Sequence, residues 1–526
     1  MPREAAVPEA TLVDNLAGGA ARHPDKPIIV FGDAVLRYGE ALARVEWLAG
    51  WLQQRCGVKR GDRVLLFGQN CPAWVLAYYA ILRADAVVVP VSAMATSDDL
   101  AYHASDAGAN LALVGREMAD RALACGALRH VLLHDADSLD AQGVPGTTGW
   151  REVMAARLRP APAQAGPDDL CVLPYTSGTT GKPKGCRHTH RTMLSSLCGS
   201  RQWRGLGPDT VALSVAPMFH LLGMQNGMNL PLLCGGTLVM LPRWDRESAA
   251  RLIEQHRVTY WAAPPTMVVD FFAQPGLERF DLSSLKLLVG GGAAIPDAVS
   301  ALLKQRYDLA LNEAYGMTET ASFLHCNPVG RERPCCLGVP TFGVDSRVVD
   351  PLTLAELPPG EVGELVTCAP QIMLGYWGRP EADAEAFVTI DGKRFLRTGD
   401  LCATDDEGYF FMRDRLKRMI SVSGYKVWPA EVENLLYGHP AVHEACVVGA
   451  PDARSGERVK ALIVLKPAAR GHTTADDVIA WARDHMAVVK APREVQFVDQ
   501  LPKSGTGKIL WRELQDREKT KQGDSP

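Results

Sequence analysis

The protein has 526 residues, in which 56 Lys and Arg stand against 60 Asp and Glu, for a formal net charge of −4 at pH 7. This near balance argues against a nucleic-acid-binding protein, which would carry a basic excess. Hydrophobic residues at 47% and charged residues at 22% are typical of a globular protein. The length suggests roughly two to four domains.

Nothing in the sequence predicts a membrane span or a secretion signal. No apolar run approaches the ~18–20 residues of a span, and the best candidate, Val87–Val91, has the length of a strand. The N-terminus, MPREAAVPEA, lacks a basic start followed by an apolar stretch. The 13 cysteines include no CxxC pair, and the adjacent Cys335 and Cys336 do not suit a zinc site. We therefore expect a cytoplasmic protein with reduced, mostly buried thiols.

Helical patterns alternate with short apolar runs along the first part of the chain. This alternation indicates parallel βαβ units, because strands covered by helices on both faces read as continuous apolar runs. We expect a large α/β body of about 400 residues in two sheet subdomains. The predicted strands are 64–67, 86–91, 110–114, 210–216, 236–241, 258–263, 285–289 and 309–314, and the predicted helices are 73–83 and 97–107, the second begun by Thr96 or Ser97.

The pattern then changes to that of a small α+β domain of about one hundred residues. A hairpin is predicted from 408–412 and 419–422, across the charged stretch between them. A helix begins at Pro429, where the missing N–H of proline costs nothing. Strands near 443–449, 458–465 and 494–498 and a helix near 474–486 complete the domain, and the charged tail after Glu518 is assigned no structure.

The strongest local signal is YTSGTTGKPKG at 175–185, directly after a strand-like apolar run. Glycines and small hydroxylated residues let N–H and O–H groups converge on phosphate oxygens, and lysines add positive charge. The segment is not a Walker A loop, because Thr176 and Pro183 stand where that pattern needs Gly and Ser or Thr. The alternative is a flexible surface loop rich in Gly and Thr. A run of eleven residues that matches a phosphate-binding composition so closely disfavours that alternative.

A second segment, YGMTE at 315–319, combines an aromatic ring with a carboxylate. The ring of Tyr315 offers a face on which a purine can stack. The carboxylate of Glu319 suits Mg²⁺, which prefers oxygen donors shared with substrate phosphates. Taken alone, the segment could equally be an aromatic and an acid at a strand end.

Together with five further blocks in order, these segments resemble the adenylate-forming (AMP-binding) superfamily of acyl-CoA synthetases, aryl-CoA ligases, luciferases and peptide-synthetase adenylation domains. The resemblance spans nearly the whole chain. It implies a large N-terminal body of βαβ sheet subdomains and a small, mobile C-terminal α+β domain. The other blocks are PMFHLLG (217–223), GGGAAIP (290–296), RTGD (397–400), DRLKRMISVSGYKVWPAEVE (414–433) and LPKSGTGKI (501–509).

The resemblance implies a set of nucleotide-binding residues. Tyr315 would stack on adenine, Thr318 would contact phosphate, and Glu319 would hold Mg²⁺ with Thr176. Glu313 replaces the Asn or Gln that relatives often carry, and a carboxylate can accept from the adenine amine but cannot donate. The implied nucleotide-binding residues are Thr176, Ser177, Gly178, Thr179, Thr180, Lys184, Gly292, Ala293, Glu313, Ala314, Tyr315, Thr318, Asp400, Arg415, Lys417 and Lys508.

The resemblance also assigns roles in the C-terminal part. Asp400 would bind both ribose hydroxyls, and Arg415 would support the ribose and the α-phosphate. Without the resemblance, Asp400 would be interpreted as a turn residue. Arg415 would be interpreted as a solvated surface charge. Residues 1–414 would form the AMP-binding N-terminal domain, 415–417 the hinge around Lys417, and 418–526 the C-terminal domain. A hinge of this kind needs a few residues at an element boundary that absorb a large φ/ψ change.

Catalysis is expected from Lys508, Thr318, Glu319 and Lys184. Lys508 would reach both the carboxylate of the acid and the α-phosphate, offsetting their repulsion in the transition state. Coenzyme A would pass Ser423 and Gly424. An acyl pocket would be lined by His220, Gly291 and Met317, although a buried core histidine is the alternative for His220.

The sequence therefore predicts an ATP-dependent acid–thiol ligase with Mg²⁺ that forms acyl-AMP and transfers the acyl group to coenzyme A. The expected pocket segments 217–226, 260–266, 290–292 and 315–318 are read as apolar and hold no Lys or Arg. A medium- or long-chain fatty acid is the first choice of substrate, and an aryl or alicyclic acid the second. A stand-alone adenylation enzyme for a carrier protein and a homodimeric state stay open. Nothing in the sequence argues for a luciferase-like oxygenase, and the presence of Lys508 speaks against a non-catalytic nucleotide sensor.

Replacing Lys508 with Ala should nearly abolish acid-dependent ATP–pyrophosphate exchange and spare thioester formation from supplied acyl-AMP. The physical reason is that two anions meet only in the first step. Measuring the two half-reactions separately checks this, and equal damage to both would defeat the assignment.

Overall fold

The computed structural model describes residues 5–134, 143–176, 182–291, 297–309, 311–333, 336–422, 425–452, 455–503 and 509–520. These residues form two compact units. The first unit comprises Met1–Asp345 and Cys368–Leu396, and the second comprises Ser346–Thr367 and Arg397–Pro526. The predicted hinge at 415–417 lies within the second unit, and the predicted division of the chain at that point stays a prediction.

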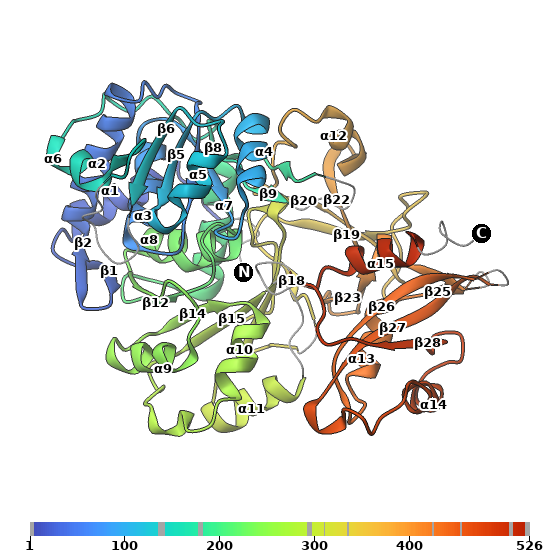
Figure 1. The fold of residues 1–526 in the computed structure, drawn as a ribbon. Helices are drawn as coiled ribbons and strands as arrows, with labels where there is room; N and C mark the ends of the chain where they lie inside the picture. Colours follow the sequence, from blue (N-terminus) through green and yellow to red (C-terminus); the bar gives the residue numbers. More distant parts are fainter. Residues whose placement is uncertain are drawn as a thin grey trace. The chain divides into compact units, whose positions relative to one another are not determined.

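The first unit contains two large, mainly parallel sheets (Figure 1). All eight predicted strands of the α/β body are present, four or five residues long in each case. One sheet has the order β18-β17-β16-β15-β14-β12-β13-β1-β2, and the other has the order β11-β8-β4-β3-β5-β6-β7. The strands are β1 (Pro27–Phe31), β2 (Ala34–Arg37), β3 (Arg63–Phe67), β4 (Val87–Val91), β5 (Leu111–Gly115), β6 (His130–His134), β7 (Thr148–Gly149), β8 (Leu170–Val172), β11 (His188–Thr189), β12 (Val211–Ser214), β13 (Thr237–Met240), β14 (Tyr260–Ala263), β15 (Leu287–Gly291), β16 (Leu311–Tyr315), β17 (His325–Cys326) and β18 (Val339–Pro340).

One hydrophobic core of this unit contains residues of both sheets and of several helices. Every residue of α3 from Pro72 to Leu82 is buried, as expected for a helix that is apolar all round. The predicted helix after Thr96 is also present, and Thr96 caps it by accepting from the Asp99 N–H. The helices are α1 (Val13–Arg22), α2 (Tyr38–Gln54), α3 (Pro72–Arg83), α4 (Ser97–Ala107), α5 (Ala119–Ala124), α6 (Trp150–Ala156), α7 (His190–Arg204), α8 (Leu230–Cys234), α9 (Arg246–Gln255), α10 (Pro265–Phe272), α11 (Asp297–Tyr307) and α12 (Pro380–Ala386), with a π-helix η2 (Leu222–Asn229) and short 3₁₀ turns η1 (Arg116–Met118), η3 (Leu277–Arg279) and η4 (Thr318–Thr320).

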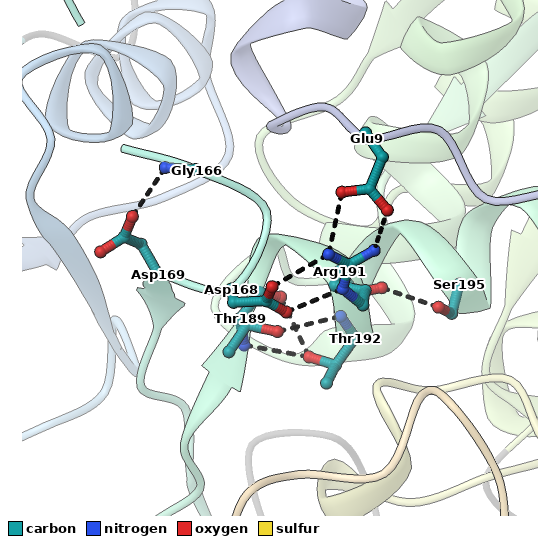
Figure 2. A network of polar contacts seen from close by, with 8 residues as sticks. All are labelled: Glu9, Gly166, Asp168, Asp169, Thr189, Arg191, Thr192 and Ser195. Atoms are coloured by element: carbon teal, nitrogen blue, oxygen red, sulfur yellow. Dashed lines mark hydrogen bonds and ion pairs between the residues drawn. The ribbon is translucent and has the colours of Figure 1, made fainter. Parts of the chain in front are cut away.

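The first turn of α7 is fixed by side chains on both sides of it (Figure 2). The Arg191 guanidinium donates to both carboxylate oxygens of Glu9, at 2.6 and 3.0 Å, and to both of Asp168, at 2.7 and 2.9 Å. Thr189 and Thr192 cap the helix reciprocally. These contacts tie the N-terminal segment to the helix that directly follows the predicted phosphate loop and β11.

A third sheet has the order β19-β20-β22-β21, with β23 paired to β22. Its long strand β22 belongs to both units, since the boundary falls between Leu396 and Arg397. The part before the boundary pairs with β21, and the part after it pairs with β23. The strands are β19 (Asp345–Val349), β20 (Gly363–Cys368), β21 (Phe387–Ile390), β22 (Lys393–Thr404) and β23 (Phe410–Arg415).

The small α+β fold predicted for the C-terminal part is present in the second unit. Its sheet has the order β25-β24-β27-β26, with β28 paired to β27. Alternate residues of β26 and β27 face two separate cores, one with α13 and α14 and one with α15. The elements are β24 (Ile420–Val422), β25 (Tyr425–Val427), α13 (Pro429–Leu436), β26 (Val442–Asp452), β27 (Gly456–Leu465), η6 (Pro467–Ala469), α14 (Ala475–His485), β28 (Glu494–Phe497) and α15 (Trp511–Thr520).

Two expectations for this part were wrong or incomplete. The predicted hairpin of 408–412 with 419–422 does not form, because β23 pairs with β22 whereas β24 pairs with β25 and β27. A 3₁₀ turn, η5 (Leu416–Arg418), separates the two strands. Helix α15 was not predicted, because its single buried apolar residue, Leu514, gives almost no periodic pattern.

Arg418 anchors the chain just after the predicted hinge. Its guanidinium forms an ion pair with Glu433 of α13 and donates to the Val447 carbonyl at 3.2 Å. Glu433 also accepts from the Val447 N–H at 2.7 Å. The side chains of Arg418 and Glu433 are only 12% and 14% exposed, so the pair is largely removed from water.

Replacing Arg418 with Leu should destabilise the second unit by about 3–5 kcal/mol, because Glu433 would keep a buried charge without its cation. Urea unfolding followed by circular dichroism measures this. The matched control is Arg246→Leu, which removes an exposed pair with Asp270 and should cost less than about 1 kcal/mol. Equal losses in the two variants would contradict the buried-pair explanation.

Candidate active site

The predicted phosphate loop is carried by a short hairpin of the first unit. Strand β9 (Tyr175–Thr176) pairs with β10 (Lys184–Gly185), and Thr176 lies opposite Lys184. The Tyr175 hydroxyl donates to Asp106 at 2.7 Å, which ties the base of the hairpin to α4. The hairpin therefore brings together Thr176 and Lys184, whereas Ser177, Gly178, Thr179 and Thr180 lie outside the described residues.

The neighbouring strands β15 and β16 bring further predicted residues together. Gly290 pairs with Glu313 and Gly291 with Ala314 in parallel register, so these residues meet at the carboxyl ends of the two strands. Ligands of open α/β sheets bind at this edge. Tyr315 ends β16 half-buried, with its ring centroid 5.7 Å from that of His325. Gly292 and Ala293 lie outside the described residues.

The turn after β16 can form only because residue 316 is glycine. A Cβ at Gly316 would lie 1.4 Å from the Ser322 carbonyl oxygen, closer than any real contact. The N–H groups of Thr320 and Ser322 both donate to the Met317 carbonyl, at 3.1 and 3.2 Å. This tight turn holds Thr318 half-buried and Glu319 buried beside the end of β16.

A segment that sequence reasoning missed, residues 373–377, runs alongside the hairpin. Leu374 and Trp377 donate their N–H groups to the carbonyls of Arg187 and Gly185, at 3.0 and 2.8 Å, and Cys186 forms a bridge with Tyr376. The segment thus acts as an added strand next to β10. The only signal in the sequence is the GYW tripeptide at 375–377, which has no periodic pattern.

Tyr376 in this segment contacts two of the predicted catalytic residues. Its hydroxyl donates to Oε1 of Glu319 at 2.9 Å, and its ring centroid lies 5.2 Å from Nζ of Lys184. Burial, and then the Glu319 carboxylate, raise the pKa of Tyr376, so that the hydroxyl keeps its proton. The Met373 N–H donates to the Glu319 carbonyl at 2.8 Å. Glu319 and Lys184 are therefore brought to one tyrosine.

His188 is a second residue that sequence reasoning missed. Its Nε2 lies 2.7 Å from the Thr318 carbonyl oxygen. Since a carbonyl can only accept, Nε2 carries the hydrogen and donates it. Burial lowers the pKa of His188 from 6.5 to about 4, so the ring is neutral at pH 7. The hydrogen bond ties the Thr318–Glu319 turn to the strand that follows the loop hairpin.

The predicted acyl-pocket residues lie in three places: His220 just before η2, Gly291 at the end of β15 and Met317 in the turn after β16. His220 is half-buried and its Nδ1 accepts from the Leu222 N–H at 3.2 Å, which fixes the orientation of its ring. Met317 packs beside Cys186 and Met373. A π-helix such as η2 is rare, and such turns are frequent at functional sites.

The expected wall 217–226 is less apolar than its sequence suggests. Arg204 reaches it from the end of α7 and is 8% exposed. Its guanidinium donates to Oδ1 of Asn226 at 3.1 Å and lies 4.7 Å from the Phe323 ring centroid. Asn226 in turn donates to Oγ of Ser322 at 2.9 Å. Reading only the wall segments missed this cation, because α7 is distant from them in the sequence.

The second unit holds Asp400 and Arg415. They are opposite each other on β22 and β23, with Nε of Arg415 3.1 Å from Oδ1 of Asp400. The Asp400 side chain is 2% exposed, whereas that of Arg415 is 47% exposed. Lys417 lies in η5, and its side chain is not described. Ser423, Gly424 and Lys508 lie outside the described residues.

The donor set fits a magnesium ion shared with a substrate. The described residues contain no group of three or more His, Cys, Asp and Glu side chains that could hold a metal by themselves. Glu319 supplies one buried carboxylate, and Thr176 a hydroxyl. Mg²⁺ is commonly held in this way, by one or two protein oxygens together with substrate phosphates and water.

Two family models match most of the chain. Residues 16–377 match the family described as AMP-binding enzyme, and residues 431–508 match the AMP-binding enzyme C-terminal domain. The chain is 37% identical over 502 residues to a feruloyl-CoA synthase of Amycolatopsis sp., covering 95% of this chain and 97% of that protein. It is 32% identical over 546 residues to a long-chain-fatty-acid–CoA ligase of Bacillus subtilis (strain 168), covering 98% and 96%.

Among solved structures, the ATP-bound MatB from Rhodopseudomonas palustris matches with a TM-score of 0.87 and 28% identity, over 97% of this chain and 99% of that one. The chain belongs to the AMP-binding enzyme family. It is a ligase of the acyl-CoA synthetase type. In the part of the chain that the structure describes, no helix is long and apolar enough to cross a membrane.

The cysteine expectation is confirmed for the described part of the chain. The twelve described cysteines are free, and most are buried.

Lowering the pH should weaken the first unit through His188. Its folded pKa, about 4, lies below its unfolded value of 6.5, so the unfolded chain binds more protons between these pH values. The stabilisation is present above pH 6.5 and is lost as the pH falls toward 4, by on the order of 2 kcal/mol at pH 5. Urea unfolding of His188→Gln should show a smaller loss between pH 7 and 5 than the native protein, with His472→Gln, at an exposed position, as the control. An unchanged loss would contradict this.

Proposed function

We propose that the protein is an ATP- and Mg²⁺-dependent acid–CoA ligase whose adenylation site is built around Glu319, Tyr376 and Lys184. The observation that carries the proposal is the convergence of a carboxylate and an ammonium group on one tyrosine beside the loop hairpin. Tyr315 would stack on the adenine, and the residues of 177–180 would contact the phosphates. Asp400 and Arg415 would bind the ribose.

The proposed reaction has two steps. A carboxylate oxygen of the acid forms a bond to the α-phosphorus of ATP, the bond from that phosphorus to the bridging oxygen breaks, and pyrophosphate leaves. The sulfur of coenzyme A then forms a bond to the acyl carbon, the C–O bond to AMP breaks, and the thiol proton is lost to solvent. Lys508 would serve the first step, and Ser423 and Gly424 would lie along the path of coenzyme A in the second.

The main role of the protein side chains in this scheme is to stabilise the negative charge of the phosphates. Lys184 would offset the negative charge of the phosphates, and Thr318 would hold a phosphate oxygen in place. Glu319 and Thr176 would hold Mg²⁺, which supplies Lewis-acid stabilisation of the phosphate oxygens when bound. The hinge at Lys417 would let the small domain present different groups in the two steps.

For the substrate, we infer an aryl acid with a polar ring substituent. The support is the buried polar cluster of Arg204, Asn226 and Ser322, which offers hydrogen-bonding groups at the expected acyl wall. A plain alkyl chain would gain nothing from such groups, because buried polar groups favour ligands that pair with them. The similarity to a feruloyl-CoA synthase points the same way.

A medium- or long-chain fatty acid is the second candidate. It was the first choice from the sequence, and the similarity to a long-chain-fatty-acid–CoA ligase favours it. The remaining wall residues, such as Leu221, Met224 and Trp261, are apolar and buried.

The test is a comparison of acids in the presence of ATP, Mg²⁺ and coenzyme A, with pyrophosphate and thioester measured separately. Ferulate and 4-hydroxycinnamate are expected to exceed unsubstituted cinnamate and the C8 to C16 fatty acids in kcat/KM. Replacing Asn226 with Leu should lower kcat/KM for the hydroxylated acid about tenfold more than kcat/KM for cinnamate, the difference being the value of one hydrogen bond.

The control is Arg201→Leu, an exposed arginine on the same helix as Arg204. Preference for fatty acids over all aryl acids would select the second candidate. Absence of acid-dependent pyrophosphate release with every acid would contradict the proposed ligase reaction itself.

A further inference from the structure

Tyr376 uses two different parts of its side chain on two oppositely charged residues. The hydroxyl donates to Oε1 of Glu319 at 2.9 Å, and the ring lies beside the ammonium group of Lys184, 5.2 Å from the ring centroid. Among the residues that the structure describes, Lys184 has no carboxylate partner within ion-pair distance. The tyrosine is therefore a neutral contact shared by both charges.

The backbone around Tyr376 leaves it little freedom. Its N–H donates to Oδ1 of Asp383 at 2.6 Å, and the flanking residues pair with Gly185 and Arg187. Gly375 precedes it at φ +144°, and a Cβ there would lie 2.4 Å from Oδ2 of Asp383. The position of the ring is thus set by the added strand and by α12, not by Glu319 or Lys184.

A direct ion pair between Lys184 and Glu319 would neutralise the charges of both side chains. In a partly buried site an opposite charge within about 4 Å is strongly attractive, so the two side chains would favour each other over a passing ligand. A tyrosine satisfies one carboxylate oxygen with a neutral donor and stabilises the ammonium group through its ring face. With Tyr376 between them, the carboxylate and the ammonium group do not neutralise each other, so each can act on a ligand.

We propose that Tyr376 is a positioning residue that keeps Glu319 and Lys184 apart, so that the carboxylate binds the metal and the ammonium group binds the phosphates of metal-bound ATP. This inference rests on the proposed function, since it takes the metal and phosphate roles from there. Tyr376 itself contacts neither the acid nor the reacting phosphorus in this scheme.

Two substitutions separate the two parts of the side chain. Tyr376→Phe removes the hydroxyl and keeps the ring beside Lys184, whereas Tyr376→Leu removes both. Calorimetric titration with Mg²⁺-ATP, and with AMP in the presence of EDTA, reports binding without any turnover. Tyr376→Phe should bind Mg²⁺-ATP about five- to tenfold more weakly, the loss of one charge-assisted hydrogen bond, and bind metal-free AMP as the native protein does.

Tyr376→Leu should bind Mg²⁺-ATP more weakly still, because Lys184 and Glu319 can then pair directly. Adding Glu319→Gln to Tyr376→Leu removes that competing pair, so the double variant should bind metal-free ATP more tightly than Tyr376→Leu alone. Tyr102→Phe is the matched control, since its hydroxyl donates to the Pro183 carbonyl at 2.6 Å and does not reach Glu319. It should leave the ratio of Mg²⁺-ATP to AMP affinity at the native value.

Three outcomes would overturn the inference. Native Mg²⁺-ATP affinity in Tyr376→Phe, with weakened affinity in Glu319→Gln, would leave the proposed metal role intact and remove the role of Tyr376. Native affinity in both variants would remove the metal role of Glu319 and the inference with it. Equal weakening of Mg²⁺-ATP and AMP binding in Tyr376→Phe, with a lowered melting temperature, would indicate a purely structural residue.

Discussion

The absence of room for a side chain at residue 316 is the constraint on which the site depends. With a Cβ at this position 1.4 Å from the Ser322 carbonyl oxygen, the chain could not double back after β16. The returning turn is then held from three sides: Ser196 of α7 donates to the Ala321 carbonyl at 2.7 Å, His188 donates to Thr318, and Met373 donates to Glu319. These contacts fix the backbone that carries the buried carboxylate of Glu319.

The same turn links Glu319 to the segment 217–226. Ser322 ends the turn and accepts from Asn226 of η2, which itself accepts from Arg204. The residues at Ala321 and Ser322 have φ values of +49° and +87°, which side-chain-bearing residues seldom adopt. Strained backbone of this kind persists only where several surrounding contacts hold it in place. Here the contacts are those of Ser196 with Ala321 and of Asn226 with Ser322.

The fold of the first unit could be predicted from the sequence because parallel strands covered on both faces leave apolar runs, and each predicted strand is found. The prediction of a hairpin between 408–412 and 419–422 was wrong, because two strands that are neighbours in the sequence need not belong to the same sheet. At the site, Thr176, Lys184 and Glu319 could be predicted from motifs. Tyr376, His188 and Arg204 could not, because each reaches the site from a different segment and only tertiary packing brings them there.

The first unit is assembled from two stretches of chain, Met1–Asp345 and Cys368–Leu396, and most of β19 and of β20, which lie between these stretches, belongs to the other unit. During synthesis the ribosome therefore delivers Glu319 and the loop hairpin well before Tyr376 and the strand that carries it. Until that segment emerges, the Glu319 carboxylate lacks its tyrosine donor and the backbone edge of β10 lacks its neighbour. The nascent chain thus carries an open strand edge beside an unfinished site, a state that favours association with other unfolded chains.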